Sequence, residues 1–202
     1  MRITIDDPYP ARKAVTMAID ALKKGGVIIY PTDTTYGIGC DLFNKDAIER
    51  VYRIKKMVKQ KPLSFICADL KDISRYAQVT NYAYQTMRRL LPGPYTFILN
   101  ATKMVPKLMI TKRKTVGIRV PDNEICLHIV SGLGNPIVTT SANIEDEDII
   151  SDPYEIEERF GADVDLFIDC GPLPTKLSSV IDLIDDNPVI VREGVGDVEE
   201  FR

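Results

Sequence analysis

Hydrophobic residues recur with helical spacing in some segments of the chain and form short continuous runs in others. Over residues 11–24 they return every three or four positions and Gly25 and Gly26 follow, so a helix is expected to end at the glycines. Further helices are predicted over residues 44–54, 69–76 (a short helix or a turn), 81–91, 125–133 and 153–160. Strands are predicted at VIIYPT, LSFICA, YTFILNA, TVGIRVP, PIVTTSA, VDLFIDCG, SSVIDLI and PVIVREG.

The order of these elements predicts an α/β fold. The strands after Tyr95 follow one another too closely for a helix to stand between every pair, which indicates a large mixed sheet. The chain has 202 residues, 45% of them apolar, and no repeat or Gly/Ser-rich linker divides it, so residues 1–202 are expected to form one domain. No leader-like or membrane-spanning apolar run occurs, and a cytoplasmic protein is expected.

Cysteine and histidine are used sparingly. Four cysteines stand far apart with no C-x-x-C pair, and His128 is the one histidine of the chain. A structural zinc site is therefore not expected, and reduced thiols that pack as small hydrophobic groups explain the cysteines. His128 lies in an apolar stretch with helical spacing, where a place on the helix surface fits better than a role as a general base. No metal ligand is predicted among the side chains.

The net charge of −3 hides a strong asymmetry. Residues 1–144 carry 22 Lys and Arg against 11 Asp and Glu, whereas residues 145–202 carry 4 against 18. No acidic residue occurs between Ile73 and Pro121. Two interpretations stay open: the first part presents a positive concavity to an anion, or the two parts pack together and neutralise each other.

One short run, RVYRIKKMVKQK at residues 50–61, holds six cations and no acid. Three roles are open for it: contact with a nucleic-acid backbone, contact with the phosphate of a small substrate, or solvation of one helix face. Asn44 is expected to cap the helix that leads into the run, whose cations then lie at the favourable C-terminal end of the helix dipole. Arg50 and Arg53 on that helix are best explained as solvated charges.

Polar groups gather at three strand ends. PTDTTYGIG, residues 31–39, sets four hydroxyl groups beside two glycines and suits a small polar ligand, although a strand followed by a glycine turn would explain the same residues. In TTSAN, Ser141 and Asn143 point the same way from an extended backbone, and either a ligand site or a polar turn accounts for them. Arg119 stands inside an apolar strand and needs an anion, either an acid of the C-terminal part or a ligand carboxylate. The chain has no P-loop and no G-x-G-x-x-G motif.

Seven motifs follow one another in the order and spacing of the YrdC-like family: YPTDTTYGIG, KPLSFI, GPYTFIL, TVGIRVP, TTSAN, SSVIDL and VREG. They run from Tyr30 to Gly194, and the chain resembles the YciO branch most. The resemblance implies a twisted α/β fold whose large, mostly mixed or antiparallel sheet is flanked by helices and carries a positively charged cavity. It also implies an L-threonylcarbamoyladenylate synthase, which uses ATP, L-threonine and bicarbonate with Mg²⁺ to make threonylcarbamoyl-AMP for the t6A modification of tRNA.

The resemblance also assigns roles to individual residues. Those implied for threonine binding are Thr34, Tyr36, Arg119 and Ser178, with Ser179 as an alternative to Ser178. Those implied for ATP binding are Lys55, Thr115, Thr139, Ser141, Asn143 and Arg192, and Lys55 is also the expected catalytic residue. Hydroxyl and amide groups suit a nucleotide, and an isolated cation suits a carboxylate.

The chain departs from the family pattern in two ways. The synthase motif K-x-R reads Lys55-Lys56-Met57, so its arginine is missing. Two histidines common in the family are also replaced, by Ile66 and Asn123. A lost guanidinium forfeits up to two charge-assisted hydrogen bonds of roughly 1.5–3 kcal/mol each.

The backbone after Ile54 decides how that loss is met. If the chain is extended there, Lys55 and Met57 share a side and the cavity holds a lysine beside a methionine. If the helix continues, Lys55 and Lys59 stack on one face and together replace the arginine. Lys56 and Lys61 are further cations within reach of the same place.

Two other functions are open beside the synthase. The basic segment and the run at residues 50–61 suit a protein that binds double-stranded RNA or tRNA without synthase activity, reading shape and backbone. Another acyl-adenylate or carbamoyl chemistry on a bound nucleotide is the third. Proteins of the t6A pathway are potential partners under the synthase interpretation.

Overall fold

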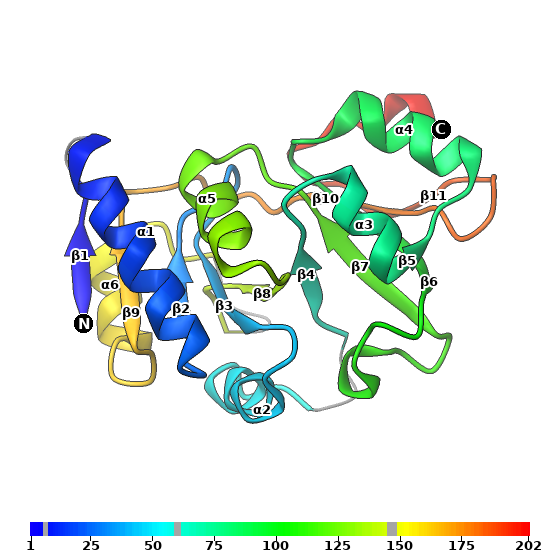
Figure 1. The fold of residues 1–202 in the computed structure, drawn as a ribbon. Coiled ribbons are helices and arrows are strands. Elements are labelled where there is room, and N and C mark those ends of the chain that lie inside the picture. Colours follow the sequence, from blue (N-terminus) through cyan, green and yellow to red (C-terminus); the bar gives the residue numbers. More distant parts are fainter. Residues whose placement is uncertain (6–7, 59–61, 145–148) are drawn as a thin grey trace.

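The computed structural model describes every residue except 6–7, 59–61 and 145–148, and its described residues form an 11-stranded sheet flanked by helices (Figure 1). The strands in spatial order are β1 (Arg2–Thr4), β9 (Leu166–Asp169), β2 (Ile28–Tyr30), β3 (Gly37–Asp41), β8 (Ile137–Ser141), β4 (Ser64–Ile66), β7 (Thr115–Arg119), β6 (Tyr95–Ala101), β10 (Ser179–Asp182) and β11 (Val189–Arg192). The short β5 (Ala77–Gln78) pairs with β6. Parallel pairs (β1 with β9, β2 with β9, β4 with β7, β6 with β10) are mixed with antiparallel ones, which confirms the predicted mixed sheet.

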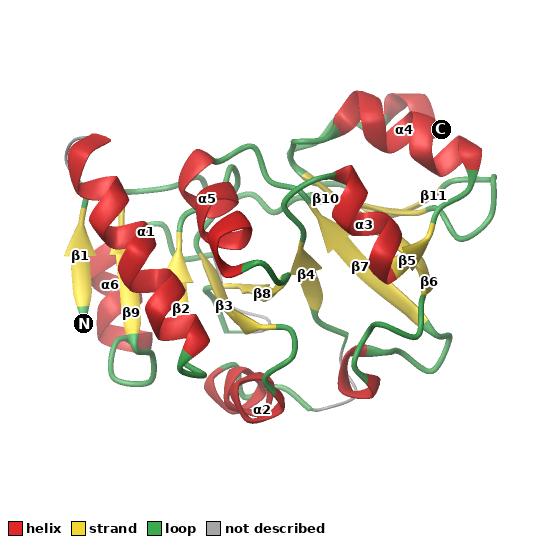
Figure 2. Ribbon diagram, in the orientation of Figure 1, coloured by secondary structure: helices red, strands yellow, loops and turns green. Residues whose placement is uncertain are grey.

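The predicted helices are present (Figure 2), and a polar side chain caps the start of each of α2 to α6. Their bounds are α1 (Pro8–Lys23), α2 (Lys45–Ile54), α3 (Leu70–Tyr76), α4 (Asn81–Leu90), α5 (Glu124–Leu133) and α6 (Pro153–Phe160), with short 3-10 helices η1 (Lys107–Met109) and η2 (Glu199–Phe201). Asn44 accepts a hydrogen bond from the Ala47 N–H, as predicted for the start of α2. Within the described ranges, no helix has the length and apolar character needed to cross a membrane.

The two glycines of PTDTTYGIG lie inside a strand and not in a turn. Both belong to β3, which pairs with β2 on one side and β8 on the other. A Cβ atom at Gly39 would come within 2.2 Å of the Val138 carbonyl oxygen, and one at Gly37 within 3.0 Å of the Tyr30 ring. Glycine is required here because neighbouring strands and a buried tyrosine approach closely, so the explanation by a glycine turn is wrong.

Two apolar clusters fill the space around the sheet. Helices α1 and α5 pack against each other over the smaller cluster, which contains Ile137 of β8 and Ile66 of β4. The larger cluster takes side chains from α2, α3, α4 and α6 and from the alternate positions of the same strands, such as Val138 and Phe65. Because successive strand residues face opposite sides, the sheet presents one face to each cluster.

The basic and acidic parts of the chain do meet in ion pairs. Arg2 pairs with Asp169 at 2.7 Å, and Arg89 pairs with Glu200 at 2.7 Å. Arg50 contacts the Asp165 carboxylate at 2.6 Å and also donates to the Asp163 carbonyl. The prediction that Arg50 is merely solvated is therefore wrong, since it ties α2 to the segment before β9, whereas Arg53 is exposed as expected.

The cysteines and the histidine take the places that their sequence context predicts. All four thiols are free, and Cys40, Cys67 and Cys126 are buried. Burial raises the pKa of the Cys126 thiol to about 12 and that of Cys170 to about 11, so both stay protonated near neutral pH. His128 is exposed on α5.

Candidate functional site

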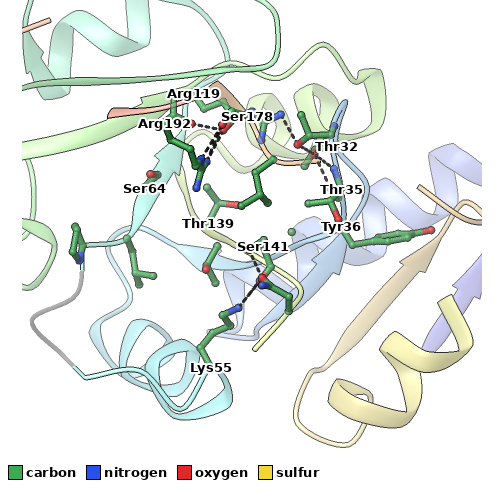
Figure 3. A pocket seen from close by; sticks show the side chains of 18 of the residues that line it. Thr32, Thr35, Tyr36, Lys55, Ser64, Arg119, Thr139, Ser141, Ser178 and Arg192 are labelled. Carbon is green, nitrogen blue, oxygen red and sulfur yellow. Dashed lines mark hydrogen bonds between the residues drawn. The ribbon is translucent and has the colours of Figure 1, made fainter. Parts of the chain in front are cut away.

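A cavity of about 480 Å³ opens on the sheet where β3, β4, β6, β7 and β8 come together with the end of α2 (Figure 3). This volume lies in the range of small-molecule sites. Its lining residues are Thr32, Thr34, Thr35, Tyr36, Gly37, Lys55, Met57, Pro62, Leu63, Ser64, Thr96, Arg119, Thr139, Thr140, Ser141, Asn143, Leu177, Ser178 and Arg192. Every residue predicted for the site except Thr115 belongs to this set.

The cavity shares a sheet face with the smaller apolar cluster. Along β8, Ile137 belongs to that cluster, and Thr139 and Ser141, two and four positions later, line the cavity. Along β4, Ile66 belongs to the cluster and Ser64 lines the cavity. Because side chains two positions apart lie on the same face of a strand, one face of the sheet covers the smaller apolar cluster at one end and lines the polar cavity at the other.

Lys55 reaches the cavity from the end of α2. Its residue is only 3% exposed, and its Nζ donates to the Ser141 carbonyl at 2.7 Å and to Asn143 Oδ1 at 3.3 Å. Figure 3 shows Lys55 bonded at the end of β8, where Ser141 lies. The amine is therefore held at a fixed place beside the cavity.

The backbone after Ile54 is neither extended nor helical. Lys56 has a φ of +52°, its N–H donates to the Arg53 carbonyl, and the Met57 N–H donates to the Tyr52 carbonyl. This pair of bonds is the Schellman motif, with Lys56 in the left-handed position that glycine usually holds. The turn leaves both Lys55 and Met57 lining the cavity and Lys56 exposed.

Of the cations suggested to replace the missing arginine, Lys56 is exposed and does not line the cavity. The helix does not continue past Ile54, so the condition under which Lys55 and Lys59 were expected to stack is not met. Lys59 and Lys61 lie outside the described residues, so their suggested approach to the cavity stays a prediction.

Ser141 and Asn143 contact each other at the cavity wall. The Ser141 hydroxyl donates to Asn143 Oδ1, and Asn143 Nδ2 donates to the Ile144 carbonyl at 3.1 Å. A polar turn and a ligand site are the alternatives that the sequence leaves open for TTSAN. In the structure these residues form the hydrogen bonds of a polar turn and also line the cavity. Thr139 also lines the cavity and accepts a 2.7 Å hydrogen bond from the buried Tyr30 hydroxyl.

Arg119 finds its acid in an unexpected part of the chain. Its guanidinium forms an ion pair with Asp33 and donates to the Thr34 hydroxyl at 2.9 Å. The side chains of Arg119 and Asp33 are each 10% exposed. The protein partner therefore comes from residues 31–39, and the alternative of an acid from the C-terminal part is wrong; the other alternative, a ligand carboxylate, stays a prediction.

The Arg119–Asp33 pair is incompletely satisfied. Arg119 Nε and Asp33 Oδ2 are buried and have no hydrogen-bond partner in the described structure. A buried ion pair offsets the cost of desolvation only when its remaining polar atoms are bonded. This pair therefore leaves part of its desolvation cost uncompensated.

Arg192 and Ser178 form a second polar unit at the cavity rim. Arg192 donates to the Ser178 carbonyl at 2.9 and 3.1 Å and to its hydroxyl at 3.3 Å, and that hydroxyl lies 3.0 Å from the Thr96 hydroxyl. Partial burial and the charge of Arg119 lower the pKa of Arg192, though the group remains a cation. Ser179 points elsewhere and bonds the Gly196 carbonyl at 2.5 Å, so Ser178 is the serine of the cavity.

Two residues predicted to bind ligand have their side chains engaged elsewhere. Thr115 lies at the opposite end of β7 from Arg119, and its hydroxyl is 2.7 Å from that of Thr111. The ring of Tyr36 points away from Lys55 and Arg192 in Figure 3, and its hydroxyl donates to the Gly171 carbonyl at 2.7 Å. A direct ligand contact is therefore unsupported for Thr115 and for the Tyr36 hydroxyl.

Sequence reasoning missed several lining residues, of which Ser64 and Thr96 are the clearest. Each is a hydroxyl residue inside an otherwise apolar strand, between neighbours that belong to the larger core. A single hydroxyl residue between core residues could have indicated both positions from the sequence, because a hydroxyl group on a buried strand rarely lacks a hydrogen-bond partner.

The lining residues favour an anionic ligand. Lys55, Arg119 and Arg192 supply three cations, of which Arg119 is already paired with Asp33, and no Asp or Glu occurs among the described lining residues. Nor do the described residues contain a group of His, Cys, Asp and Glu side chains that could hold a metal by itself. Phosphate or carboxylate groups surrounded by hydroxyl donors fit this arrangement.

Comparison with known proteins gives consistent matches. A family model named for Sua5, YciO and YrdC, and described as telomere recombination, matches residues 20–194. The protein YciO of Escherichia coli is 44% identical over 194 residues, which cover 95% of this chain and 94% of that protein. The threonylcarbamoyl-AMP synthase of Vibrio vulnificus is 31% identical over 153 residues, covering 74% of this chain and 82% of the relative. The structure of Pyrococcus abyssi Sua5 complexed with L-threonine superposes with a TM-score of 0.92 at 27% identity, covering 99% of this chain and 59% of that one.

Proposed function

The chain belongs to the Sua5/YciO/YrdC family, and from that premise we propose that it is an L-threonylcarbamoyladenylate synthase-like enzyme. Residues 1–202 would act as one domain that converts ATP, L-threonine and bicarbonate into threonylcarbamoyl-AMP and pyrophosphate. Two relatives support the reaction class: one is named a threonylcarbamoyl-AMP synthase, and another was solved with L-threonine.

The observation that carries the proposal is the cavity itself. Three cations and several hydroxyl groups surround about 480 Å³ of space, with no carboxylate among the described lining residues. ATP and threonine both present anionic groups, and the chemistry needs the developing charge on phosphate to be stabilised by fixed donors. A site that positions the two substrates and neutralises the charge on the phosphates is sufficient for this reaction.

The reaction has two steps. The threonine amine first attacks bicarbonate, and loss of water leaves a carbamate. A carbamate oxygen then forms a bond to the α-phosphorus of ATP while the bond between that phosphorus and the bridging oxygen breaks, and pyrophosphate leaves with the electron pair. Lys55 and Arg192 are proposed at the phosphates with Ser141, Asn143 and Thr139 around the nucleotide.

The other polar groups are proposed to hold the amino acid. Arg119 would donate hydrogen bonds to the threonine carboxylate, assisted by Thr34 and Ser178. Because Asp33 already occupies part of the Arg119 guanidinium, the carboxylate would use the donors that remain. Charge-assisted bonds of this kind fix orientation as well as charge.

Mg²⁺ is proposed to accompany ATP. The described lining residues carry no carboxylate, so the phosphate oxygens and water would supply most of its ligands. When bound, the ion would neutralise charge on the phosphates. The proposed setting is the cytoplasm, where the product serves tRNA modification together with other proteins of that pathway.

Pyrophosphate release tests the proposal directly. The full chain is incubated with ATP, bicarbonate, Mg²⁺ and L-threonine, and threonine-dependent pyrophosphate and threonylcarbamoyl-AMP are expected. Omission of threonine is the control, and other amino acids in its place identify a different acyl-adenylate chemistry. Absence of threonine-dependent release at high enzyme concentration would contradict the synthase.

A second candidate function is the binding of double-stranded RNA or tRNA. It is favoured by the link between β6 and β7, where five cations are exposed and none is ion-paired with a described residue: Lys103, Lys107, Lys112, Arg113 and Lys114. Phosphate contacts from such side chains supply affinity without sequence readout.

A further inference from the structure

Tyr36 connects three parts of the chain that are distant in sequence. Its hydroxyl donates to the Gly171 carbonyl at 2.7 Å and accepts from the Cys170 N–H at 2.8 Å, which fastens it to the turn after β9. Its own carbonyl accepts from the Ala142 N–H at 2.8 Å, between the cavity residues Ser141 and Asn143. The residue itself follows directly on the Thr32–Thr35 segment of the cavity wall.

A buried carboxylate extends this connection to the edge of the sheet. Asp169 is 3% exposed, and its Oδ1 accepts from the Gly171 N–H at 2.8 Å and lies 3.4 Å from the Tyr36 hydroxyl. Its Oδ2 accepts from Arg2 at 2.7 and 3.0 Å. Arg2 belongs to the edge strand β1, pairs also with Glu157 of α6, and lies over the Tyr154 ring.

The Tyr36 ring is held as firmly as its hydroxyl. The residue is fully buried, and the ring meets Phe167 edge-on with centroids 5.3 Å apart. The hydroxyl and the ring are thus held by contacts with β9 and the turn after it, while the backbone joins the Thr32–Thr35 segment directly and bonds Ala142. A bond to a ligand would require the hydroxyl to leave three partners, so a different role fits the geometry better.

We propose that Tyr36 is a positioning residue, supported by Asp169 and Arg2, that fixes the Thr32–Thr35 segment relative to the Ser141–Asn143 segment. This inference rests on the proposed function for its kinetic consequence and deepens it. Under that function one segment contacts the amino acid and the other the nucleotide. Their mutual placement then sets how closely the carbamate oxygen approaches the α-phosphorus.

Tyr36→Phe tests the inference because it removes the hydroxyl and keeps the ring. A misplacement of about 1 Å can cost on the order of 100-fold in rate, so we expect kcat to fall at least about tenfold while KM for ATP and threonine changes less than about threefold. The measurements are made well below the melting temperature of the variant. Amide hydrogen exchange at Ala142 is expected to accelerate about tenfold, since that N–H bonds the Tyr36 carbonyl.

Arg2→Ala and Arg50→Ala form a matched pair that separates positioning from stability. Both arginines tie an outer element to an acid near the sheet, but only Arg2 reaches Tyr36, through Asp169. Arg2→Ala should lower kcat and speed Ala142 exchange in the same sense as Tyr36→Phe, by about threefold. Arg50→Ala should lower the melting temperature without either effect, and Tyr76→Phe serves as the control for loss of a buried tyrosine hydroxyl.

The outcomes are distinct. Unchanged kcat and unchanged Ala142 exchange in Tyr36→Phe overturn the inference, as does an Arg50→Ala variant that matches Arg2→Ala in both readouts. If Tyr36→Phe does not fold, the arginine pair decides. If the unaltered chain shows no threonine-dependent pyrophosphate release, the proposed function fails, and exchange at Ala142 still tests the coupling of the two segments.

Discussion

Lys55 and Lys56 are adjacent in the sequence but lie in opposite environments. The Lys55 amine is buried against the Ser141 carbonyl, whereas Lys56 is exposed with a left-handed backbone. Lys55 is therefore a residue of the site, and Lys56 provides a control with the same charge outside the cavity. The pair lets the chemistry of one amine be tested while the charge of the segment changes equally in both variants.

Lys55→Met is expected to lower threonine-dependent pyrophosphate release by about 100-fold, in the range found for loss of one fixed donor to a transition-state charge. Lys56→Met, which removes the same charge outside the cavity, should change the rate less than twofold. Steady-state kinetics at saturating ATP distinguish the two. Equal effects of both variants would show that net charge and not a fixed amine is what matters.

Met57 occupies the position of the arginine in the family motif, and Met57 lines the cavity. Met57→Arg would restore up to two charge-assisted bonds of roughly 1.5–3 kcal/mol each to a phosphate. We expect faster adenylate formation, by about tenfold. Val58→Arg is the matched control, because Val58 is 67% exposed and the same charge then lies in solvent. A gain in both variants would point to long-range attraction of ATP.

Arg119 and Asp33 offer a test of stability at the same scale. Removing one partner of a buried ion pair leaves an uncompensated charge and typically costs about 3–5 kcal/mol. We therefore expect Arg119→Met and Asp33→Asn each to lower the free energy of unfolding by about that amount in urea titrations. The double variant should lose clearly less than the sum. Additive losses would mean that the two side chains do not interact.

The end of α2 is set by hydrogen bonds that the amino-acid types alone would not suggest. A Schellman motif usually has glycine at the left-handed position, where this chain has Lys56. The helix nonetheless stops there, because the turn buries Lys55 and packs Met57 against the larger core. Tertiary contacts therefore choose the helix end over local preference.

Lys56→Gly is expected to stabilise the protein by about 0.5–1 kcal/mol. The left-handed conformation costs an L-residue roughly 1–2 kcal/mol, a cost that glycine avoids. Part of this gain is offset because glycine gives the unfolded chain more conformational entropy. Arg53→Gly, an exposed position inside α2, should instead destabilise by about 1 kcal/mol. Thermal and urea unfolding measure both. Destabilisation by Lys56→Gly would show that the lysine side chain itself holds the turn.

At the scale of the whole molecule, the predicted elements explain most of the fold, and the contacts between them explain the site. Capping residues such as Asn44 and apolar periodicity suffice for the helices. Strand β3 was missed because Gly37 and Gly39 resemble a turn until β8 and Tyr30 are packed against them. Likewise, the Asp33 partner of Arg119 is 86 residues away and depends on strand order, which local patterns do not encode.

The distribution of exposed charge gives a prediction for RNA. The cations between β6 and β7 project from one link of the chain, and counterion release would make their affinity for double-stranded RNA fall steeply with salt. Replacing Lys112, Arg113 and Lys114 by Gln should reduce the slope of log affinity against log salt by about 2–3. Fluorescence titrations at several salt concentrations measure it. Binding that barely depends on salt cannot rest on phosphate contacts.

The alternation along β4 and β8 has a consequence for how such a protein can change. Side chains that line the cavity, such as Ser64 and Thr139, occupy positions between core residues such as Phe65 and Val138, which face the opposite side. A substitution at Ser64 or Thr139 therefore changes a side chain on the cavity face and not one of the larger core. Along these two strands the positions that line the cavity alternate with positions that build the larger core, so a point mutation at a lining position such as Ser64 can change ligand preference while the core residues beside it are kept.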